Sequence, residues 1–584
     1  MFGVTKRFLP GIWLVVAAAI AAAGGCVWDR PIAIPPADAM HRPDTCVLVM
    51  FADGLYRPVF DEMLSAGELP NLRRHLFGRG TRIADAVTVI PSITYPAGVS
   101  MLTGQLPGHH GITGNRWFDR DTLVLEDYIG PSDYQHVDSE FAAPTLFEMT
   151  PDLYSVSVLF APHRGVTRYF SNWTSGGFTL VFGTMEELDA LTAYRVGEIG
   201  REAAAAGRWP DILWLYFPGP DHIAHQFGPG SPQYRAILRN LDVQVGRVAD
   251  ALRQAGVYDR TLITLISDHG HMPVDPARRV DLIGRLRDDG FTVSNRELVG
   301  GTYEQRLGEF GPARIVVLDD GNRRAALHLR AGPKWADRPT LAQIERFHRD
   351  FGGPAVRDNP APFWNVLLSA LPPGRLAAIR DGDNRVILAS EAGQSAVDRQ
   401  IQQPAGSGGK APGSQPDHHV AGAGSLAAIP LAGSSYRYTV LTGADPLGLA
   451  SSPAAEKLLD GRFHSSEDWL EATIDSSAPD LVAQIVDYFD SRRSGDLLLF
   501  STGRWQFAAG TAGGHGGITP MDMRIVWAFA GPTIPAGCSV PFGRVVDLTP
   551  TLLDFLGRLD QPAKSPPFDG VSRLSELRSA RPNP

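Results

Sequence analysis

Short apolar runs that are followed by helical stretches set the strongest limit on the fold of this 584-residue chain. These runs show no polar alternation, which is typical of strands buried on both faces of a mostly parallel sheet. The pattern therefore predicts an α/β fold in which such a sheet is sandwiched by helices. The predicted strands are residues 47–51, 156–160, 212–217, 262–266, 497–500 and 525–530, and the predicted helices are 58–66, 185–206, 231–254, 479–492 and 548–556.

Two regions interrupt this rhythm and divide the predicted core. Residues 272–392 mix loops with short strand signals and are expected to form an inserted α+β cap subdomain. Residues 393–425 are rich in Gly, Ser, Gln, Ala and Pro, a composition that indicates a flexible linker. The core is then expected in two parts, residues 46–271 and 426–577.

The N-terminus has the layout of an export signal. Lys6 and Arg7 precede an apolar run over residues 8–23, and small residues then lead to Cys26. This layout predicts a signal peptide at residues 1–25 and resembles a bacterial lipoprotein signal, in which Cys26 is lipidated. Residues 26–45 read as a tether, so we expect export across the inner membrane and a lipid-anchored place in the cell envelope or periplasm. An ordinary signal peptide cleaved nearby, or an uncleaved anchor, remains the alternative.

Charge and cysteine content exclude other classes of protein. The formal net charge is −9, with 54 basic and 63 acidic residues, so binding to a nucleic-acid polymer is not expected. Three cysteines cannot build a disulfide scaffold in a chain of this length. Whether Cys46 and Cys538 pair depends on how close the fold brings them, which the sequence leaves open.

Carboxylates and imidazoles gather at four places, each beside the end of a predicted strand. In open α/β sheets, ligands bind beyond the carboxyl ends of the strands, so residues scattered along the chain can converge there. Taken singly, an Asp-Gly pair is usually a turn and a lone His is usually a surface or hydrogen-bonded core residue. The residues concerned are Asp53, Asp221, His225, Asp268, His269 and His515.

Together, three Asp and three His form a mixed nitrogen and oxygen ligand set. Such a set suits zinc better than magnesium or calcium, which prefer oxygen ligands. Six ligands can hold two ions with three ligands each, leaving positions open for a nucleophile and substrate oxygens. This is the two-metal layout used for in-line displacement at phosphorus.

A candidate nucleophile stands before Tyr95-Pro96, where a helix-like run begins. Proline is favoured in the first turn of a helix, so Thr94 is expected at the helix N-terminus. Backbone N–H groups there favour phosphate and an activated hydroxyl. The alternative is that Thr94 only caps the helix.

These segments resemble the alkaline phosphatase superfamily, and most closely its type I phosphodiesterase/nucleotide pyrophosphatase family. The resemblance covers residues 46–272 and 495–560 and implies an alkaline-phosphatase-like core. It implies two Zn²⁺ ions, one held by Asp221, His225 and His515, the other by Asp53, Asp268 and His269, with Thr94 bridging them as the phosphorylated nucleophile. The motifs, in the family's order, are Phe51-Ala52-Asp53-Gly54, Thr94-Tyr95-Pro96, His110-Gly111-Ile112, Asn115, Asp221-xxx-His225, Ser267-Asp268-His269-Gly270 and Gly514-His515-Gly516.

The resemblance also gives roles to two further residues. Asn115 takes the family position that binds a phosphoryl oxygen. Monoesterase relatives carry Lys-x-Arg-Gly where this chain has Pro162-His163-Arg164-Gly165, so the lysine is replaced and the arginine is kept. Arg164 either clamps a phosphoryl oxygen or is a loop arginine. His109, His222 and His271 do not match liganding positions and are expected to be ordinary histidines.

The resemblance implies a zinc-dependent phosphoester hydrolase of the phosphodiesterase/nucleotide pyrophosphatase type, acting on a small phosphate ester through a phospho-threonine. With one clamping cation left, we expect diesters to be preferred over monoesters. A phosphomonoesterase of the same superfamily is the main alternative. Sulfatases are disfavoured because the C/S-x-P-x-R context is missing, and an envelope phosphotransferase or a non-catalytic binding protein is less favoured still.

Overall fold

The computed structural model describes residues 44–129, 133–170, 184–401, 433–507, 510–560 and 568–582. The predicted signal peptide, Cys26 and most of the tether lie outside these residues. Within the described ranges, no helix combines the length and the hydropathy that crossing a bilayer requires.

The first sheet has the predicted α/β character, with ten strands in the order β23-β22-β2-β21-β8-β1-β7-β5-β6 and β20 paired to β2. Its central block of β8, β1, β7, β5 and β6 is parallel throughout, while β21 runs antiparallel between β8 and β2. The fold is therefore alkaline-phosphatase-like, as predicted. The strands are β1 (Cys46–Ala52), β2 (Thr81–Val87), β5 (Ser155–Val158), β6 (Arg168–Phe170), β7 (Ile212–Phe217), β8 (Thr261–Ile266), β20 (Arg524–Ile525), β21 (Trp527–Ala530), β22 (Cys538–Arg544) and β23 (Arg581–Pro582).

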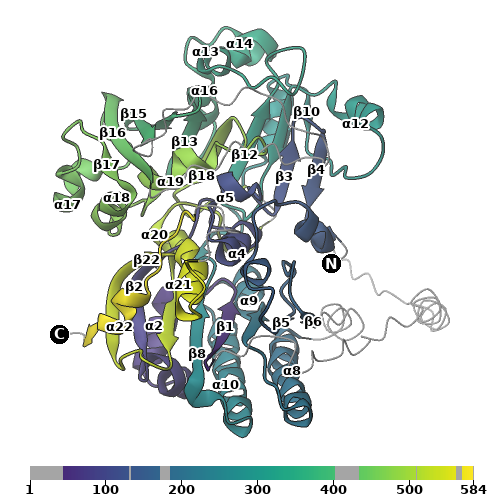
Figure 1. The fold of residues 1–584 in the computed structure, drawn as a ribbon. Coiled ribbons are helices and arrows are strands. Elements are labelled where there is room, and N and C mark those ends of the chain that lie inside the picture. The colour runs from purple at the N-terminus through teal and green to yellow at the C-terminus, as the bar shows by residue number, and fades with distance from the viewer. Residues whose placement is uncertain are drawn as a thin grey trace, which may run out of the picture.

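Helices cover both faces of this sheet because its strands are apolar on both sides. On β1, Leu48 and Met50 pack into one buried cluster together with α8 and α10, whereas Val49 and Phe51 pack into another together with α4 and α21. Figure 1 shows α8 and α10 side by side below the sheet and α4 above it. The covering helices are α2 (Arg57–Ser65), α4 (Thr94–Thr103), α8 (Met185–Ala206), α9 (Gly219–Phe227), α10 (Pro232–Gln254), α21 (Leu548–Phe555) and α22 (Leu574–Ser579). A further helix, α19 (Leu481–Tyr488), packs against the strands at residues 385–390, 393–401 and 434–443.

The ends of the long helices follow from local side-chain chemistry. The hydroxyl of Thr184 accepts the Glu187 N–H at the start of α8, and Gly207 ends it with φ of 65°. At the start of α10 the hydroxyl of Ser231 accepts the Tyr234 N–H. The predicted helix at 185–206 is confirmed residue for residue.

A second sheet of nine strands packs onto the first and is mostly antiparallel, in the order β10-β11-β12-β18-β13-β14-β15-β16-β17. Leu498 and Phe500 of β18 belong to the same buried cluster as Val49 and Phe51 of β1, so the two sheets share one core. The strands are β10 (Val293–Ser294), β11 (Ile315–Leu318), β12 (Arg324–Leu329), β13 (Arg375–Arg380), β14 (Arg385–Ser390), β15 (Gly393–Ile401), β16 (Ser434–Gly443), β17 (His464–Ser465) and β18 (Leu497–Ser501).

The structure differs from the expected boundaries in three places. Residues 434–443 and 464–465, expected in the second part of the core, form β16 and β17 of the second sheet. Residues 497–500, expected in the catalytic sheet, also lie in the second sheet, because an apolar run shows that a strand is buried but not which sheet it joins. Residues 393–401, expected to begin the linker, form β15. That strand is polar along much of its length, so its composition resembles that of a linker. The rest of the expected linker up to residue 425 lies outside the described residues.

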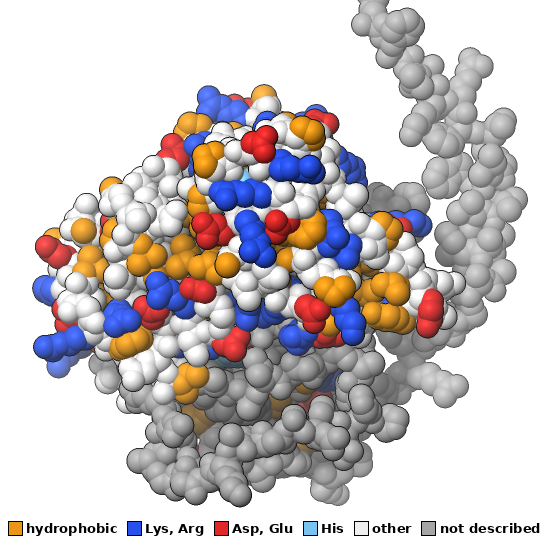
Figure 2. All heavy atoms as spheres, turned by 90° about the horizontal axis from the view of Figure 1, so that it is seen from above, with side chains coloured by type: hydrophobic (Ala, Val, Ile, Leu, Met, Phe, Trp, Pro, Cys, Tyr) orange, Lys and Arg blue, Asp and Glu red, His pale blue; other side chains and the backbone are white. Residues whose placement is uncertain are grey.

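The surface seen from above the second sheet is mixed in character. In Figure 2, basic and acidic side chains are interspersed with hydrophobic and neutral ones over the described atoms. Inside the fold, Cys46 and Cys538 are both buried free thiols, so the structure does not pair them.

A buried ion pair fastens the hairpin of β3 (Arg116–Asp119) and β4 (Val124–Asp127) to the second sheet. Arg120 donates to Asp496 at 2.7 Å, both side chains are fully buried, and the same carboxylate accepts the Leu329 N–H. Arg120→Met removes the hydrogen-bonded partner of this carboxylate and leaves only Arg338, 3.8 Å away, as a charged neighbour, so we expect the free energy of unfolding to fall by about 3 kcal/mol. Chemical denaturation with a linear extrapolation measures it.

The control is the exposed pair between Arg79 and Asp259, whose carboxyl side chain is 94% exposed. Asp259→Ala should leave the denaturation midpoint almost unchanged. Equal losses in Arg120→Met and Asp259→Ala would contradict the special role of the buried pair.

Candidate active site

Neighbouring parallel strands bring the three predicted carboxylates together. Asp53 follows β1, Asp268 follows β8, and Asp221 lies in the first turn of α9 beyond β7, while β1 pairs with both β7 and β8. Gly54 permits the close approach, because it has φ of +61° and a Cβ there would lie 2.8 Å from Asp221. The strand ends therefore converge as the sequence predicts.

A small two-stranded sheet adds His515 from the far end of the sequence. β19 (Gly513–Gly514) pairs with β9 (Met272–Pro273), so the residues after β19 lie beside the segment that follows β8. The rings of His269 and His515 stack with centroids 3.7 Å apart. The pairing of β19 and β9 thus joins the two parts of the chain at this site.

The resulting donor atoms form two overlapping groups that could hold metal ions, each with donor atoms within 4.8 Å of one another. His225 lies at the edge of the larger group, with its Nε2 3.5 Å from Asp221 Oδ1. All six residues predicted as ligands are therefore brought together. The groups are Asp53, Asp268 and His269, and Asp221, His269, His271 and His515.

Three of the histidines point Nδ1 at a backbone carbonyl and Nε2 at the carboxylates. The Nδ1 atoms of His225, His269 and His515 lie 2.9–3.0 Å from the carbonyl oxygens of Gly513, Gly270 and Ser92, respectively. A carbonyl only accepts, so each Nδ1 carries a proton, and in the neutral imidazole each Nε2 keeps its lone pair. This arrangement is typical of metal-ligating histidines, whose second nitrogen donates to a fixed acceptor.

The carboxylates of Asp53 and Asp268 each have one oxygen engaged and one unengaged. Tyr216 O–H donates to Asp53 Oδ2 and Gly54 N–H donates to Asp268 Oδ1. The other oxygens, Asp53 Oδ1 and Asp268 Oδ2, are buried and meet no donor among the described residues. They lie 3.5 and 3.2 Å from His269 Nε2. Donors that share a tetrahedral zinc at ~2.0–2.1 Å lie ~3.3 Å apart, so this spacing fits such an ion.

Burial and mutual repulsion disfavour having all three carboxylates ionised with no cation between them. Burial, and then the nearby Asp268 and Asp221, hold the pKa of Asp53 well above its usual range. Burial also raises the pKa of Asp268. Burial alone would raise the pKa of Asp221 too, but His225, His271 and His515 bring it well below its usual range. Buried carboxylates this close need either a shared proton or a cation.

Thr94 begins α4 and points its hydroxyl at this group. The residue that caps the helix is Ile93, so Thr94 is not a simple cap. Its Oγ1 lies 3.3 Å from His269 Nε2. The Asn115 Oδ1 accepts the Tyr95 N–H at 3.0 Å, which leaves the Asn115 amide nitrogen as a donor beside the helix N-terminus.

Arg164 is the predicted site residue that the structure assigns elsewhere. Its guanidinium donates to Glu148 Oε1 at 2.9 Å and to the carbonyls of Asp138, Phe141 and Ala143. It also lies 4.2 Å over the Phe141 ring. Of the two roles that the sequence left open for Arg164, these contacts favour a loop arginine over a clamp on a phosphoryl oxygen.

His271 is the residue of the site that sequence reasoning missed. It is fully buried, and its Nε2 lies 2.7 Å from Asp221 Oδ1. The signal available in the sequence was its spacing, two residues after His269 in the loop beyond β8. His222 is exposed on α9, as expected for an ordinary histidine.

A third group of possible ligands, His109, Asp487 and Asp490, is already balanced by protein contacts. His109 Nδ1 lies 2.7 Å from Asp569 and its Nε2 lies 3.2 Å from Asp490. Arg399 pairs with both Asp487 and Asp490. The group therefore acts as an ion-pair network between the two sheets.

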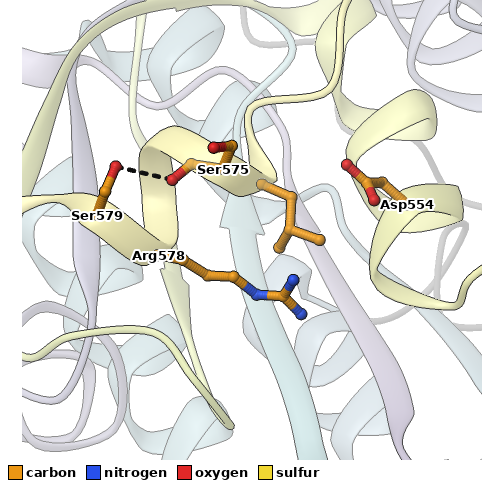
Figure 3. A pocket seen from close by; sticks show the side chains of 5 residues that line it. Asp554, Ser575, Arg578 and Ser579 are labelled. Carbon is orange, nitrogen blue, oxygen red and sulfur yellow. Dashed lines mark hydrogen bonds between the residues drawn. The ribbon is translucent and has the colours of Figure 1, made fainter.

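Two cavities of about 400 Å³ lie outside the carboxylate cluster. One lies between the sheets and includes Met272 and Ile518 in its wall, which follow His271 and His515 closely in the chain. The other lies between α21 and α22 and is lined by Asp554, Leu574, Ser575, Arg578 and Ser579 (Figure 3). Ser579 there donates to the Ser575 carbonyl within α22, and none of its lining residues belongs to a possible metal group.

Comparison with known proteins identifies related sequences. The profile of the family described as type I phosphodiesterase / nucleotide pyrophosphatase matches residues 47–351, a little over half of the chain. An uncharacterized pyrophosphatase/phosphodiesterase of Schizosaccharomyces pombe is 25% identical over 233 residues, covering 39% of this chain and 44% of that protein. Human ectonucleotide pyrophosphatase/phosphodiesterase family member 7 is 24% identical over 327 residues, covering 53% and 63%. The chain thus spans about half the length of these relatives.

Solved structures share the fold at low sequence identity. Murine ectonucleotide pyrophosphatase/phosphodiesterase 5 matches with a TM-score of 0.52 and 14% identity, covering 92% of this chain and 100% of that one. An inactive variant of the same murine protein, in complex with AMP, matches with a TM-score of 0.52 and 15% identity over the same shares of the two chains.

Arg164→Ala should destabilise the loop that its guanidinium holds and lower the melting temperature. Because Arg164 contacts loop carbonyls, we expect turnover of a phosphomonoester and of a phosphodiester to change by the same factor. Arg164→Lys is the matched control, since it keeps the charge but cannot make the same set of hydrogen bonds. A monoester rate that falls tenfold further than the diester rate would restore the clamping role.

Proposed function

The chain belongs to the type I phosphodiesterase/nucleotide pyrophosphatase family, and on that premise we propose that it is a metal-dependent hydrolase of phosphoric diester or pyrophosphate bonds. The observation that carries the proposal is that four donor atoms lie close to one another. Asp53 Oδ1, Asp268 Oδ2 and Thr94 Oγ1 lie 3.5, 3.2 and 3.3 Å from His269 Nε2. The Thr94 hydroxyl, a possible nucleophile, thus lies beside three side chains that can bind one metal ion.

The donor chemistry supports zinc at two positions. Three carboxylates and three histidine Nε2 atoms form the mixed oxygen and nitrogen set that zinc accepts. Asp53, Asp268 and His269, with Thr94, would hold one ion, and Asp221, His225 and His515 would hold the other. The two buried carboxylate oxygens that meet no donor support this assignment, because coordination would satisfy both. When bound, the zinc pair supplies Lewis acidity that lowers the pKa of the Thr94 hydroxyl and offsets charge on phosphoryl oxygens.

The chain's own groups account for the remaining chemistry. Thr94 Oγ1 attacks phosphorus in line, forms a phospho-threonine and expels the leaving alcohol or phosphate, and water then cleaves that ester. In the first turn of α4 the Tyr95 and Ala97 N–H groups are bonded within the protein and Pro96 has none, so the Thr94 N–H is the backbone donor that remains for a phosphoryl oxygen. Asn115, fixed through its Oδ1 to the Tyr95 N–H, donates from its amide nitrogen to a phosphoryl oxygen.

A small nucleotide or another small phosphate ester is the proposed substrate class. A Xenopus laevis relative, 23% identical over 233 residues that cover 40% of this chain and 49% of that protein, is named bis(5'-adenosyl)-triphosphatase, and the murine structure holds AMP. These names support a phosphodiester or pyrophosphate bond between small groups. Export and lipid anchoring through Cys26 remain part of the proposal.

Metal content tests the ligand assignment. We expect two zinc ions per chain by atomic absorption, and loss of turnover after chelation that added zinc restores. His515→Ala and Asp268→Asn should each retain one ion, since they remove ligands from different positions. His222→Ala, the exposed histidine next to Asp221, is the control and should keep both. A metal-free protein with full turnover would rule out the mechanism.

Thr94 is expected to be the covalent nucleophile. Thr94→Ala should keep the melting temperature and both metals but lose kcat by several orders of magnitude, whereas Thr94→Ser should retain partial turnover because it keeps a hydroxyl. Thr103→Ala, at the other end of the same helix, is the control for loss of a helix hydroxyl. Wild-type turnover in Thr94→Ala would remove this residue from the chemistry.

Diesters should be preferred over monoesters. A monoester brings an additional charged oxygen that needs a cationic donor, yet Arg164 is engaged in its loop and Asn115 is neutral. We expect kcat/KM for a bis-aryl phosphate to exceed that for the aryl phosphate by at least ~10-fold, or about 1.4 kcal/mol. The reverse preference at saturating zinc would favour the monoesterase alternative.

A further inference from the structure

His271 stands apart from the other histidines of the cluster by its distance to Asp221. Its Nε2 lies 2.7 Å from Asp221 Oδ1, whereas the Nε2 atoms of His225 and His515 lie 3.5 and 3.7 Å from the same oxygen. Two donors that share a tetrahedral zinc lie ~3.3 Å apart. The two longer distances fit joint coordination, and the shorter one fits a hydrogen bond.

The ring nitrogens of His271 have the opposite arrangement from those of the ligand candidates. His225, His269 and His515 donate through Nδ1 to carbonyls and keep the Nε2 lone pair. A carboxylate only accepts, so the bond to Asp221 requires a proton on His271 Nε2. Its Nδ1 is buried and has no partner among the described residues. His271 therefore has no lone pair on the nitrogen that faces the cluster.

The backbone on both sides fixes the position of this ring. A Cβ on Gly270 would lie 2.1 Å from the Met521 carbonyl oxygen, so the chain is tightly packed immediately before His271. Immediately after it, Met272 pairs with Gly514 in the small sheet. The ring is also held at 80° and 75° to those of His225 and His515, with centroids 4.8 and 5.3 Å apart. The donor is thus held in place before any ion binds.

We propose, resting on the proposed two-metal hydrolase, that His271 is a positioning residue for one metal site. Its Nε2–H occupies one lone pair of Asp221 Oδ1 and turns the carboxylate so that the other lone pair faces the ion held with His225 and His515. Outer-shell donors of this kind typically change metal affinity by 10–100-fold. His271 therefore sets the affinity of this site without contacting the substrate.

Metal affinity, measured by competition with a fluorescent zinc chelator, tests the proposal. His271→Phe keeps a ring but removes the donor, so the dissociation constant of one zinc should rise ~10–100-fold while that of the other stays unchanged. His271→Gln places an amide N–H near the former Nε2 and should lose less. Saturating zinc should restore most of the turnover in both variants. If the Phe variant does not fold, His271→Leu replaces it.

The control is His328→Gln on β12, which removes another fully buried histidine whose nitrogens have no partner in the described chain. This variant should change the stability of the protein but should not change the affinity of either zinc site. The cobalt-substituted protein identifies the ligands: the visible absorption of His271→Phe at saturating cobalt should match the wild type. If His271→Phe loses one ion completely and its spectrum changes, His271 is a metal ligand. If the zinc affinities of the Phe and Leu variants are unchanged, His271 does not position the metal site. A wild type that binds no zinc would instead contradict the proposed function.

Discussion

Repulsion among three adjacent carboxylates, two of them buried and the third partly buried, is the constraint on which the rest of the site depends. Asp53, Asp221 and Asp268 come from the ends of adjacent strands; Asp53 and Asp268 are buried, and the side chain of Asp221 is 18% exposed. Protein donors satisfy only part of their oxygen atoms, and the unengaged oxygens face histidine nitrogens that have kept their lone pairs. An arrangement of this kind is unfavourable in an empty protein and favourable around cations. The same geometry places the hydroxyl of Thr94 where it can be activated.

The shared core of the two sheets explains how so many distant residues keep these positions. Residues of β1 and β18 lie in one buried cluster, and α4 packs against it from the first part of the chain. The pairing of β9 with β19 then places His515 beside His269. Because the second sheet is packed onto this core, it is a structural part of the same body as the candidate site.

Sequence reasoning succeeded where a local pattern determines the outcome. The helical stretch at residues 185–206 predicted α8, and apolar runs predicted β1, β7 and β8, so the convergence of Asp53, Asp221 and Asp268 followed from the topology of a parallel sheet. It failed where partners come from elsewhere in the chain. The hydrogen bonds of Arg164 to loop carbonyls, the sheet to which β18 belongs and the bond of His271 to Asp221 all depend on tertiary contacts that no local pattern encodes.

The measurement that tests the central claim most directly is anomalous X-ray diffraction from zinc-loaded crystals at the zinc edge. The account predicts two peaks ~4 Å apart. One should lie among Asp53, Asp268, His269 and Thr94, and the other among Asp221, His225 and His515. No peak at these positions, or a peak only at the balanced group of His109, Asp487 and Asp490, would contradict it.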